Sequence, residues 1–361
     1  MTIINNVPVQ AHFYTSAELH DTFAIPTPPI SEQNKIFIAL KSEVIKSGVL
    51  DRRYVYYFVK TMINVLAVLG VFVGLYLLQG NLLIQFLLVL PYIFFTVQIV
   101  GIVHDAGHRA VASSSLTNDA IGLALIGPFG GASYSWWFDK HNAHHASPNE
   151  EDSDPDIDFP IVAFTREQAE KKRGIARWFV RHQVSLYIFL VALVPFNMRI
   201  HSIIKLVKGK SRYPFWESIG MASYFVIFGT VLVQTLPLPL AGLFFLLSQM
   251  GVGWYLASIF APNHKGMPAI AKDTPLSFFW KQVITSRDVT AHPLTDFIYL
   301  GLNYQVEHHL FPNTPLYNIR KLQTIVKKYC HQAGLPFHET GAIASYREIY
   351  SILAEASQGA R

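Results

Sequence analysis

Histidine is concentrated in three short stretches of the sequence. Seven of the fifteen histidines lie in HDAGH (His104 and His108), HNAHH (His141, His144 and His145) and EHH (His308 and His309). Residues three and four apart share one face of a helix, so the first two stretches each present their imidazoles together. Imidazoles gathered on one face are costly to bury unless they are hydrogen-bonded or bound to metal. The three stretches therefore predict a metal site.

Such a site must be built from nitrogen and oxygen ligands. The chain has one cysteine, Cys330, which can form neither an internal disulfide nor a cysteine-based metal site. Imidazoles suit iron, zinc, copper or nickel, and seven of them exceed the needs of one ion, so two metals are the simplest hypothesis. Oxygen activated at a pair of irons can break an unactivated C–H bond, whereas zinc has no redox chemistry. The residues alone leave iron and zinc open.

Composition indicates that membrane helices position these histidines. The chain of 361 residues is 51% hydrophobic and 15% charged, with a mean hydropathy of +0.28, whereas soluble domains carry about 25% charged residues. Four apolar segments are long enough to cross ~30 Å of hydrocarbon as helices: residues 61–79, 82–103, 218–235 and 239–261. The links within each pair, residues 80–81 and 236–238, are very short. We therefore expect two helical hairpins.

Lysine and arginine surround the hairpins on one side only. They precede the first segment, recur between the hairpins and follow the last segment, while the links inside the hairpins carry no charge. The positive-inside rule then places both termini, the central stretch and all three histidine stretches in the cytoplasm. Two further apolar runs, 120–138 and 184–198, are broken by glycine or proline, and we expect helices that lie at or dip into the membrane surface. No cleavable signal peptide is predicted in residues 1–59.

No linker, repeat or low-complexity tract divides the chain, so we expect one domain over residues 1–361. The predicted fold class is all-α and integral to the membrane, with four transmembrane helices in two hairpins and a cytoplasmic helical cap that carries a di-metal site. In chain order we expect a cytoplasmic N-terminal segment, the first hairpin, a region with the first two histidine stretches, the second hairpin and a C-terminal region with the third stretch. The boundaries are 1–59, 60–103, 104–216, 217–261 and 262–361.

The three stretches, read as HDAGH, HNAHH and QVEHHLFP with two hydrophobic hairpins around the middle one, resemble the three histidine boxes of the membrane fatty acid desaturase family. The similarity in motifs covers residues 104–320. Gln305, where many members carry a histidine, resembles the front-end class, which desaturates between an existing double bond and the carboxyl end of the chain. Sphingolipid desaturases and some acyl-lipid enzymes have related third boxes.

This resemblance implies that the seven histidines ligate two irons. It also implies an eighth ligand, His264, just after the fourth apolar segment, while His292 has a weaker case. A ligating imidazole usually donates its other N–H to a carboxylate or carbonyl, so acidic neighbours should orient the rings. The expected supporting residues are Asp105, Glu307, Gln305 and Asn263, and the acidic run at 149–160 supplies further candidates in Asp152, Asp154 and Asp156.

The reaction implied by the resemblance is an oxygen-dependent removal of two hydrogens from adjacent methylenes of a fatty acyl lipid, acyl-CoA or acyl carrier protein. No GxGxxG fingerprint for a flavin or nicotinamide cofactor is present, so the electrons should come from an external donor. No HPGG haem motif is present either, so a separate ferredoxin or cytochrome b5 is expected. Membrane lipids are further expected partners, and no feature indicates nucleic-acid binding.

Two other classes of function fit the same residues. A di-iron hydroxylase or ketolase acting on a lipid, alkane or carotenoid would use the same histidines but insert oxygen. A zinc-binding membrane hydrolase or receptor-like protein would bind zinc and show no dependence on oxygen.

Overall fold

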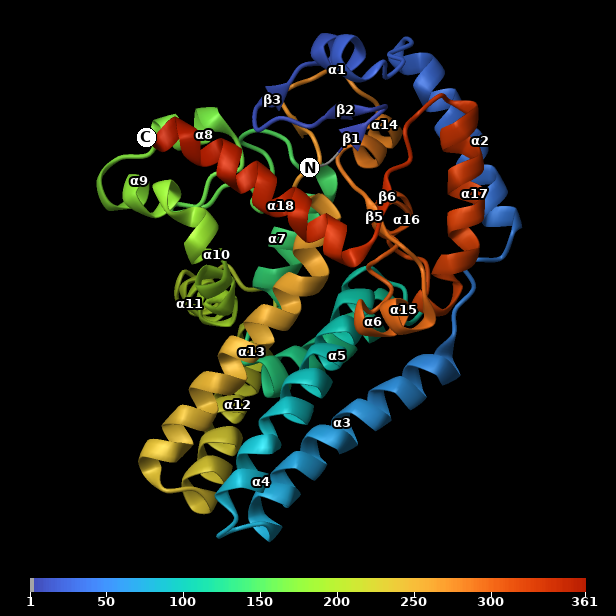
Figure 1. Ribbon diagram of the computed structural model, residues 1–361. Coiled ribbons are helices and arrows are strands. Elements are labelled where there is room, and N and C mark those ends of the chain that lie inside the picture. The colour runs from blue at the N-terminus through green and yellow to red at the C-terminus, as the bar shows by residue number, and fades with distance from the viewer. Residues whose placement is uncertain (1–2) are drawn as a thin grey trace. The chain divides into compact units, whose positions relative to one another are not determined.

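A computed structural model of the chain describes residues 3–361, and most of them are helical (Figure 1). Internal contacts divide the chain into two compact units, each assembled from segments that lie far apart in the sequence. Unit 1 comprises residues 1–51, 140–187 and 259–361, and unit 2 comprises residues 52–139 and 188–258. Each unit is described by itself.

Unit 2 consists of helices. They are α3 (Tyr54–Leu77), α4 (Leu82–Leu87), α5 (Val89–Gly107), α6 (Ser115–Leu125), the π-helix η1 (Ile126–Gly130), α11 (Val194–Val207) and α12 (Pro214–Thr235). Three more helices have residues in both units: α7 (Tyr134–Ala146), α10 (Gln183–Ala192) and α13 (Leu238–His264).

Four stretches of helix are long and apolar enough to cross a membrane, which confirms the four predicted segments. They are Tyr54–Leu77, Leu82–Gly107, Pro214–Thr235 and Leu238–His264. The first begins earlier than its apolar run, because the aromatic residues after Tyr54 continue the same helix. Within the predicted surface run at 184–198, α10 and α11 meet at a bend of 60°, so this segment is a broken span or a re-entrant pair.

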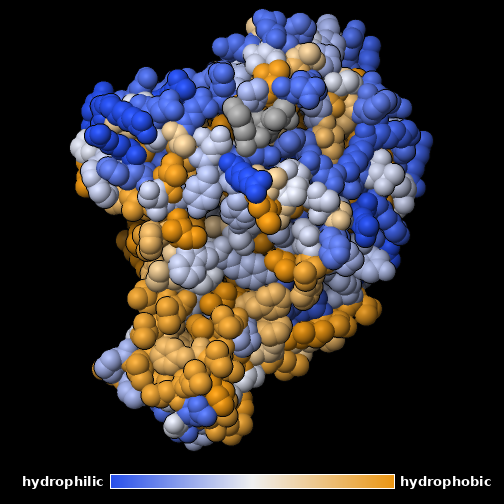
Figure 2. Space-filling view, viewed as in Figure 1, coloured by the Kyte–Doolittle hydropathy of each residue, from blue (hydrophilic) through white to orange (hydrophobic). Residues whose placement is uncertain are grey.

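The outer surfaces of these helices are apolar. In the most hydrophobic window of α3 only 22% of the residues are buried, and Val55 and Leu77 are 78% and 74% exposed. Figure 2 shows hydrophobic residues gathered over the helices of unit 2. A helix that is hydrophobic all round and exposed requires an apolar medium, as expected for a protein in contact with lipid.

Two glycines allow a close backbone approach inside unit 2. η1 packs against α12, and at this contact a Cβ atom added to Gly220 would lie 3.0 Å from the Cα of Gly127. A side chain on either residue would push the two backbones apart. Next to this contact the buried core of unit 2 is aromatic, with Tyr92 and Phe228 stacked at 4.7 Å between ring centroids.

Unit 1 is also mainly helical. Its helices are α1 (Ser16–Phe23), α2 (Ile30–Lys46), α8 (Arg166–Lys171), α9 (Gly174–Arg181), α14 (Phe278–Ile284), α15 (Pro293–Ile298), α16 (Gln305–Leu310), the 3-10 helix η2 (Leu316–Asn318), α17 (Ile319–Gln332), α18 (Ala342–Ala356) and the 3-10 helix η3 (Ser357–Ala360). Its strands are β1 (Ile3–Ile4), β2 (Val7–Pro8), β3 (Phe13–Tyr14), β4 (Ala269–Ile270), β5 (Asp288–Val289) and β6 (Glu339–Thr340).

The strands of unit 1 form three short pairs that join distant parts of the chain. β1 and β2 are antiparallel, whereas β3 pairs with β4 and β5 pairs with β6 in parallel. A buried core supports them around Trp280, whose indole donates to the carbonyl of Pro26 at 2.7 Å. The N-terminal segment and the C-terminal residues are thereby packed onto the segment 269–289, which lies just before the third histidine stretch.

We predict that Gly220→Ala destabilises unit 2. The added methyl group would meet the backbone of η1, and overpacking of this kind costs about 1–3 kcal/mol. Gly229, in the same helix, is the matched control, because a Cβ atom there meets nothing within 4 Å. Thermal unfolding in detergent should show a lower Tm for Gly220→Ala and an unchanged or higher Tm for Gly229→Ala. Equal Tm values for the two variants would contradict the close approach.

Candidate metal centre

The second histidine stretch forms the last turns of α7. His141, His144 and His145 lie on this helix at spacings of three and four residues. The third stretch forms the short helix α16, which carries the buried residues His308 and His309. Asp288 holds the start of α16, because its carboxylate accepts the backbone N–H of Val306 at 3.1 Å. Both helices contribute these histidines to unit 1.

Three imidazoles of unit 1 point their Nε2 atoms toward one another. We call this set triad A: His144, His264 and His309. The Nε2 atom of His264 lies 3.2 Å from Nε2 of His144 and 3.0 Å from Nε2 of His309. One ligand atom from each residue lies within 4.8 Å of the others, a separation that a single metal ion can bridge.

The opposite side of each triad A ring has a hydrogen-bond acceptor. Nδ1 of His144 lies 2.9 Å from an oxygen of Asp154, and Nδ1 of His264 lies 3.0 Å from the carbonyl of Thr285. Nδ1 of His309 lies 2.7 Å from Oε1 of Gln282. The acceptors draw the ring proton to Nδ1 in all three residues. Each Nε2 therefore carries a lone pair, and three lone pairs that point at one another repel unless a cation lies between them.

A second set of imidazoles has a similar arrangement. Triad B consists of His141, His145 and His308. Nε2 of His145 lies 3.1 Å from Nε2 of His141 and 3.1 Å from Nε2 of His308. The two consecutive histidines of α7 thus belong to different triads, and so do the two of α16. Unit 1 alone offers two metal sites with ligands of nitrogen only, a donor set that suits iron, zinc, copper or nickel.

His104 and His108 belong to unit 2, at the carboxyl end of α5. Their ring centroids are 4.8 Å apart. Asp105, predicted as a supporting residue, has one oxygen 3.2 Å from Nδ1 of His104 and accepts a hydrogen bond of 2.6 Å from Tyr57 at the other. The first stretch therefore has its own pair of imidazoles and its own orienting carboxylate.

Gln305 and Asn263, two of the expected supporting residues, lie beside triad A. The side chain of Asn263 donates to Oε1 of Gln305 at 2.9 Å. Nε2 of the Gln305 amide then lies 2.8 Å from Nε2 of His264. In this orientation the NH2 group of Gln305 faces triad A, where it can donate a hydrogen bond to Nε2 of His264 or to a water molecule.

Among the acidic candidates, Asp154 hydrogen-bonds to triad A, and an oxygen of Asp156 lies farther off, 3.6 Å from Nδ1 of His144. The second oxygen of Asp154 accepts the backbone N–H of Asn149 at 2.8 Å, which fixes the loop after α7. Burial by itself would raise the pKa of Asp154, but the hydrogen bonds from His144 and from the backbone of Asn149, together with the charge of Lys265, hold that pKa below its usual value. Asp154 is therefore a carboxylate at neutral pH and can accept from His144.

Glu307 lies against Asp288 rather than against an imidazole. Both carboxyl groups are fully buried. Burial, together with the charge of Asp288, raises the pKa of Glu307 far above its usual value, and burial raises the pKa of Asp288 to about 6. One of the two groups is thus protonated at neutral pH. The pair joins Asp288 to α16, which carries Glu307.

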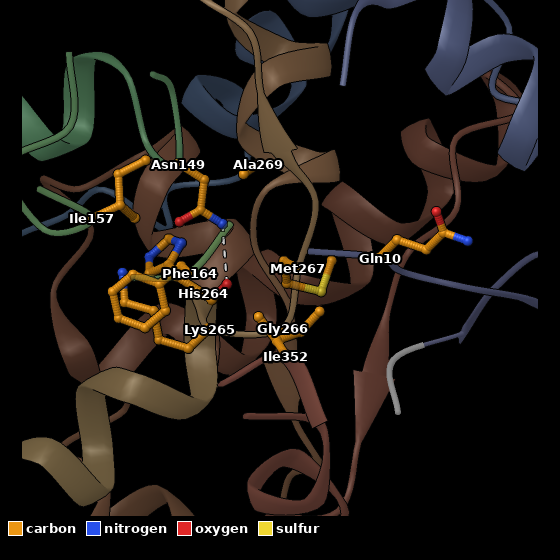
Figure 3. A pocket seen from close by; sticks show the side chains of 10 residues that line it. All are labelled: Gln10, Asn149, Ile157, Phe164, His264, Lys265, Gly266, Met267, Ala269 and Ile352. Carbon is orange, nitrogen blue, oxygen red and sulfur yellow. Dashed lines mark hydrogen bonds between the residues drawn. The ribbon is translucent and has the colours of Figure 1, made fainter. Parts of the chain in front are cut away.

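The turn that carries His264 borders a small cavity of unit 1 (Figure 3). Asn149 reaches into it and donates to the carbonyl of His264 at 3.0 Å, the contact drawn as a dashed line. Lys265 donates to the carbonyl of Asp156 at 2.7 Å, and its ammonium lies 4.5 Å from the centre of the Phe164 ring. Both side chains join the acidic loop to the His264 turn.

Two groups that accept hydrogen bonds from triad A were not predicted from the sequence: the side chain of Gln282 and the carbonyl of Thr285. Gln282 donates to the carbonyl of His145 at 2.8 Å and accepts from His309, so it connects the second and third stretches. This donation also fixes which end of its amide faces His309. No motif marks either residue, because their roles follow from the folding of α14 against α16. His292, the weaker ligand candidate, caps α15 instead.

Burial also keeps the imidazole of His309 in its neutral form. It lowers the pKa of His309 well below the usual value, and the neighbouring His264 and His144 lower it further. A histidine with a depressed pKa is neutral at pH 7 and stays neutral until the pH falls below that lowered value. Neutral imidazole is the form that ligates metal.

Comparison with known proteins gives a family. The family model described as fatty acid desaturase matches residues 81–341. The chain is 31% identical to a Delta(6)-fatty-acid desaturase of Caenorhabditis elegans over 251 residues, which are 65% of this chain and 56% of that protein. It is 30% identical to an acyl-lipid (9-3)-desaturase of Borago officinalis over 324 residues, which are 86% of this chain and 72% of that protein.

A third relative has a different kind of substrate in its name. The chain is 28% identical to a Delta 8-(E)-sphingolipid desaturase of Emericella nidulans over 260 residues, which are 66% of this chain and 48% of that protein. The aligned part of this chain thus spans about half the length of the first and third relatives.

We predict that Asp154→Asn weakens metal binding at triad A. The amide cannot supply the negative charge that makes His144 a stronger ligand, and loss of such a partner typically costs about 10- to 100-fold in metal affinity. Titration of the metal-free protein with Co²⁺, followed by absorption, measures the change. Asp158→Asn is the control, since Asp158 is exposed on the same loop. An Asp154→Asn protein that binds Co²⁺ like the control would contradict the role of Asp154.

Proposed function

Because this chain belongs to the fatty acid desaturase family, we propose that it is a membrane-bound, oxygen-dependent fatty acid desaturase that introduces a cis double bond into an acyl chain at a non-haem di-iron centre. The observation that carries the proposal is the pair of histidine triads in unit 1. Each presents three ring nitrogens around one point, and the number of sites matches the two metals expected from the sequence.

The proposed ligands follow from the triads and the first histidine stretch. Triad A would hold one iron through His144, His264 and His309. Triad B would hold the second through His141, His145 and His308. The family resemblance implies that His104 and His108 are iron ligands as well. Bound there, the iron pair would activate oxygen for the removal of hydrogen from a methylene carbon, which no acid or base in the chain could achieve.

The residues of the chain hold and orient this centre. Asp154, Thr285 and Gln282 keep the ring protons on Nδ1, so that each Nε2 remains a ligand. Gln282 also connects α14 to both the α7 and the α16 histidines, which limits the freedom of triads A and B to move apart. Gln305 supplies a neutral amide at the edge of triad A.

The reaction requires two electrons from a partner. Removal of two hydrogen atoms from the acyl chain supplies two electrons, and reduction of O₂ to two waters consumes four, together with two further protons. The sequence has no flavin or nicotinamide fingerprint, so we propose an external ferredoxin or cytochrome b5 as donor.

The substrate is a fatty acyl chain carried by a lipid, by coenzyme A or by an acyl carrier protein. Gln305 in the third box and the Delta(6) and acyl-lipid relatives support a front-end desaturase. The sphingolipid desaturase among the relatives makes a sphingolipid the alternative substrate. The names of the relatives favour desaturation over hydroxylation or ketone formation, and over a zinc enzyme.

For the membrane, we propose that the four apolar helices form two hairpins. The histidine-bearing residues of unit 1 then form a cytoplasmic cap, with both termini on the same side. The distribution of lysine and arginine supports this orientation.

We predict that a host expressing the wild-type chain with a ferredoxin system makes a new fatty acid two mass units lighter than a supplied one. His308→Ala should abolish this product, because it removes a ligand of triad B. His20→Ala should retain it, because His20 lies exposed on α1. Gas chromatography with mass spectrometry of total acyl chains measures both. A product sixteen mass units heavier would instead identify a hydroxylase.

The proposed orientation is tested by labelling single cysteines in intact cells. The native Cys330 is fully buried and should not react. A cysteine in place of Asn81, between α3 and α4, should react with an impermeant reagent added outside, whereas one in place of the exposed Asp158 should react only after the cells are opened. The reverse pattern would place unit 1 on the other side.

A further inference from the structure

The helix that carries His264 ends in a weak turn. α13 contains Pro262 two residues before its last residue, His264. Proline has no N–H, so one hydrogen bond of the last turns is missing, and the final carbonyl groups of any helix lack partners within it. Without support from outside the helix, the backbone around His264 would be free to fray. A ligand on a frayed turn could not hold its Nε2 at a fixed point.

One buried side chain supplies most of that support. Arg287 donates from Nε to the carbonyl of Pro262 and from Nη2 to the carbonyl of Lys265 at 2.5 Å. Its backbone N–H donates to the carbonyl of Asn263 at 2.9 Å. The remaining carbonyl, that of His264, accepts from the side chain of Asn149 and from the backbone N–H of Met267, both at 3.0 Å. Arg287 therefore contacts the carbonyls on both sides of the ligand, and its positive charge lies at the negative end of the helix dipole.

Arg287 is itself held by the C-terminal helix. The guanidinium is fully buried and pairs with Glu348 of α18, and Nη2 also lies 3.4 Å from the carbonyl of Ser345. Burial lowers the pKa of Arg287 to about 10, which leaves it protonated at neutral pH. All of these residues belong to unit 1.

We propose that Arg287 is a positioning residue for the metal centre: it caps the carboxyl end of α13 and thereby fixes the direction in which His264 presents Nε2 to triad A. The inference rests on the proposed function, since it takes His264 as a metal ligand. It adds a residue outside the histidine boxes to the machinery.

The alternative role for Arg287 is that of a buried ion pair only. Such a pair contributes little net stability but is costly to break, because the remaining charge stays buried. An ion pair and a helix cap require different properties of the side chains at positions 287 and 348. An ion pair needs a positive charge at 287 and a negative charge at 348, whereas a cap needs the planar fork of arginine, which lysine cannot reproduce.

Two variants therefore separate the roles. Arg287→Lys keeps the charge pair but cannot donate to the carbonyls of Pro262 and Lys265 together. Glu348→Gln removes the charge pair but keeps an oxygen for Arg287 and leaves the cap in place. Arg166→Ala is the control, because Arg166 forms an exposed ion pair with Glu355 of the same helix α18.

The first readout is the affinity for Co²⁺ of the metal-free, full-length chain in lipid nanodiscs. We expect Arg287→Lys to bind one of two Co²⁺ ions about 10- to 100-fold more weakly, while Glu348→Gln and Arg166→Ala stay within about threefold of the wild type. The reverse order, with Glu348→Gln weak and Arg287→Lys unchanged, would overturn the cap and leave an ion pair. Equal affinity in all variants would overturn the proposal as well.

The second readout needs no metal. Hydrogen exchange of peptides that cover residues 259–267 should be faster in metal-free Arg287→Lys than in the wild type, with no change in peptides from α17. Unchanged exchange around His264 would contradict the cap. A wild-type protein that binds no metal would refute the proposed function, whereas the exchange measurement would still decide whether Arg287 holds the His264 turn.

Discussion

The candidate centre depends on one constraint: every imidazole must present an unprotonated nitrogen to a shared point. A neutral imidazole carries its single proton on one of two nitrogens, and only an acceptor on the far side decides which. In triad A three different acceptors do this, namely the carboxylate of Asp154, the carbonyl of Thr285 and the amide oxygen of Gln282. Much of unit 1 serves to place these three acceptors next to the Nδ1 atoms of the three rings.

The same constraint explains why the histidines come in adjacent pairs. Consecutive residues on a helix point about 100° apart, so the two rings of an HH pair face different points. His144 and His309 turn to triad A, while their neighbours His145 and His308 turn to triad B. Two short helices from distant parts of the chain thus contribute to both sites at once. Gln282 connects them, which relates the geometry of one triad to that of the other.

The parts of this arrangement that follow local rules could be predicted from the sequence. Four apolar runs became four helices long enough to span a membrane, because their length and hydropathy need no tertiary information. The four-residue spacing of His141 and His145 on α7 brought these two rings together for the same reason, although His144 turns to the other triad. His264 came from family resemblance, and Gln282, Thr285 and Arg287 were not found at all. These residues act through contacts between segments that only folding brings together, and a side chain that accepts from a ring or caps a helix leaves no periodic signal.

The most direct test of the di-iron proposal is to locate iron in the protein itself. Anomalous scattering measured at the iron edge, from crystals of the iron-loaded chain, would show where each ion lies. We expect two peaks, one bounded by Nε2 of His144, His264 and His309 and the other by Nε2 of His141, His145 and His308. A single peak, or iron bound away from both triads, would contradict the proposal.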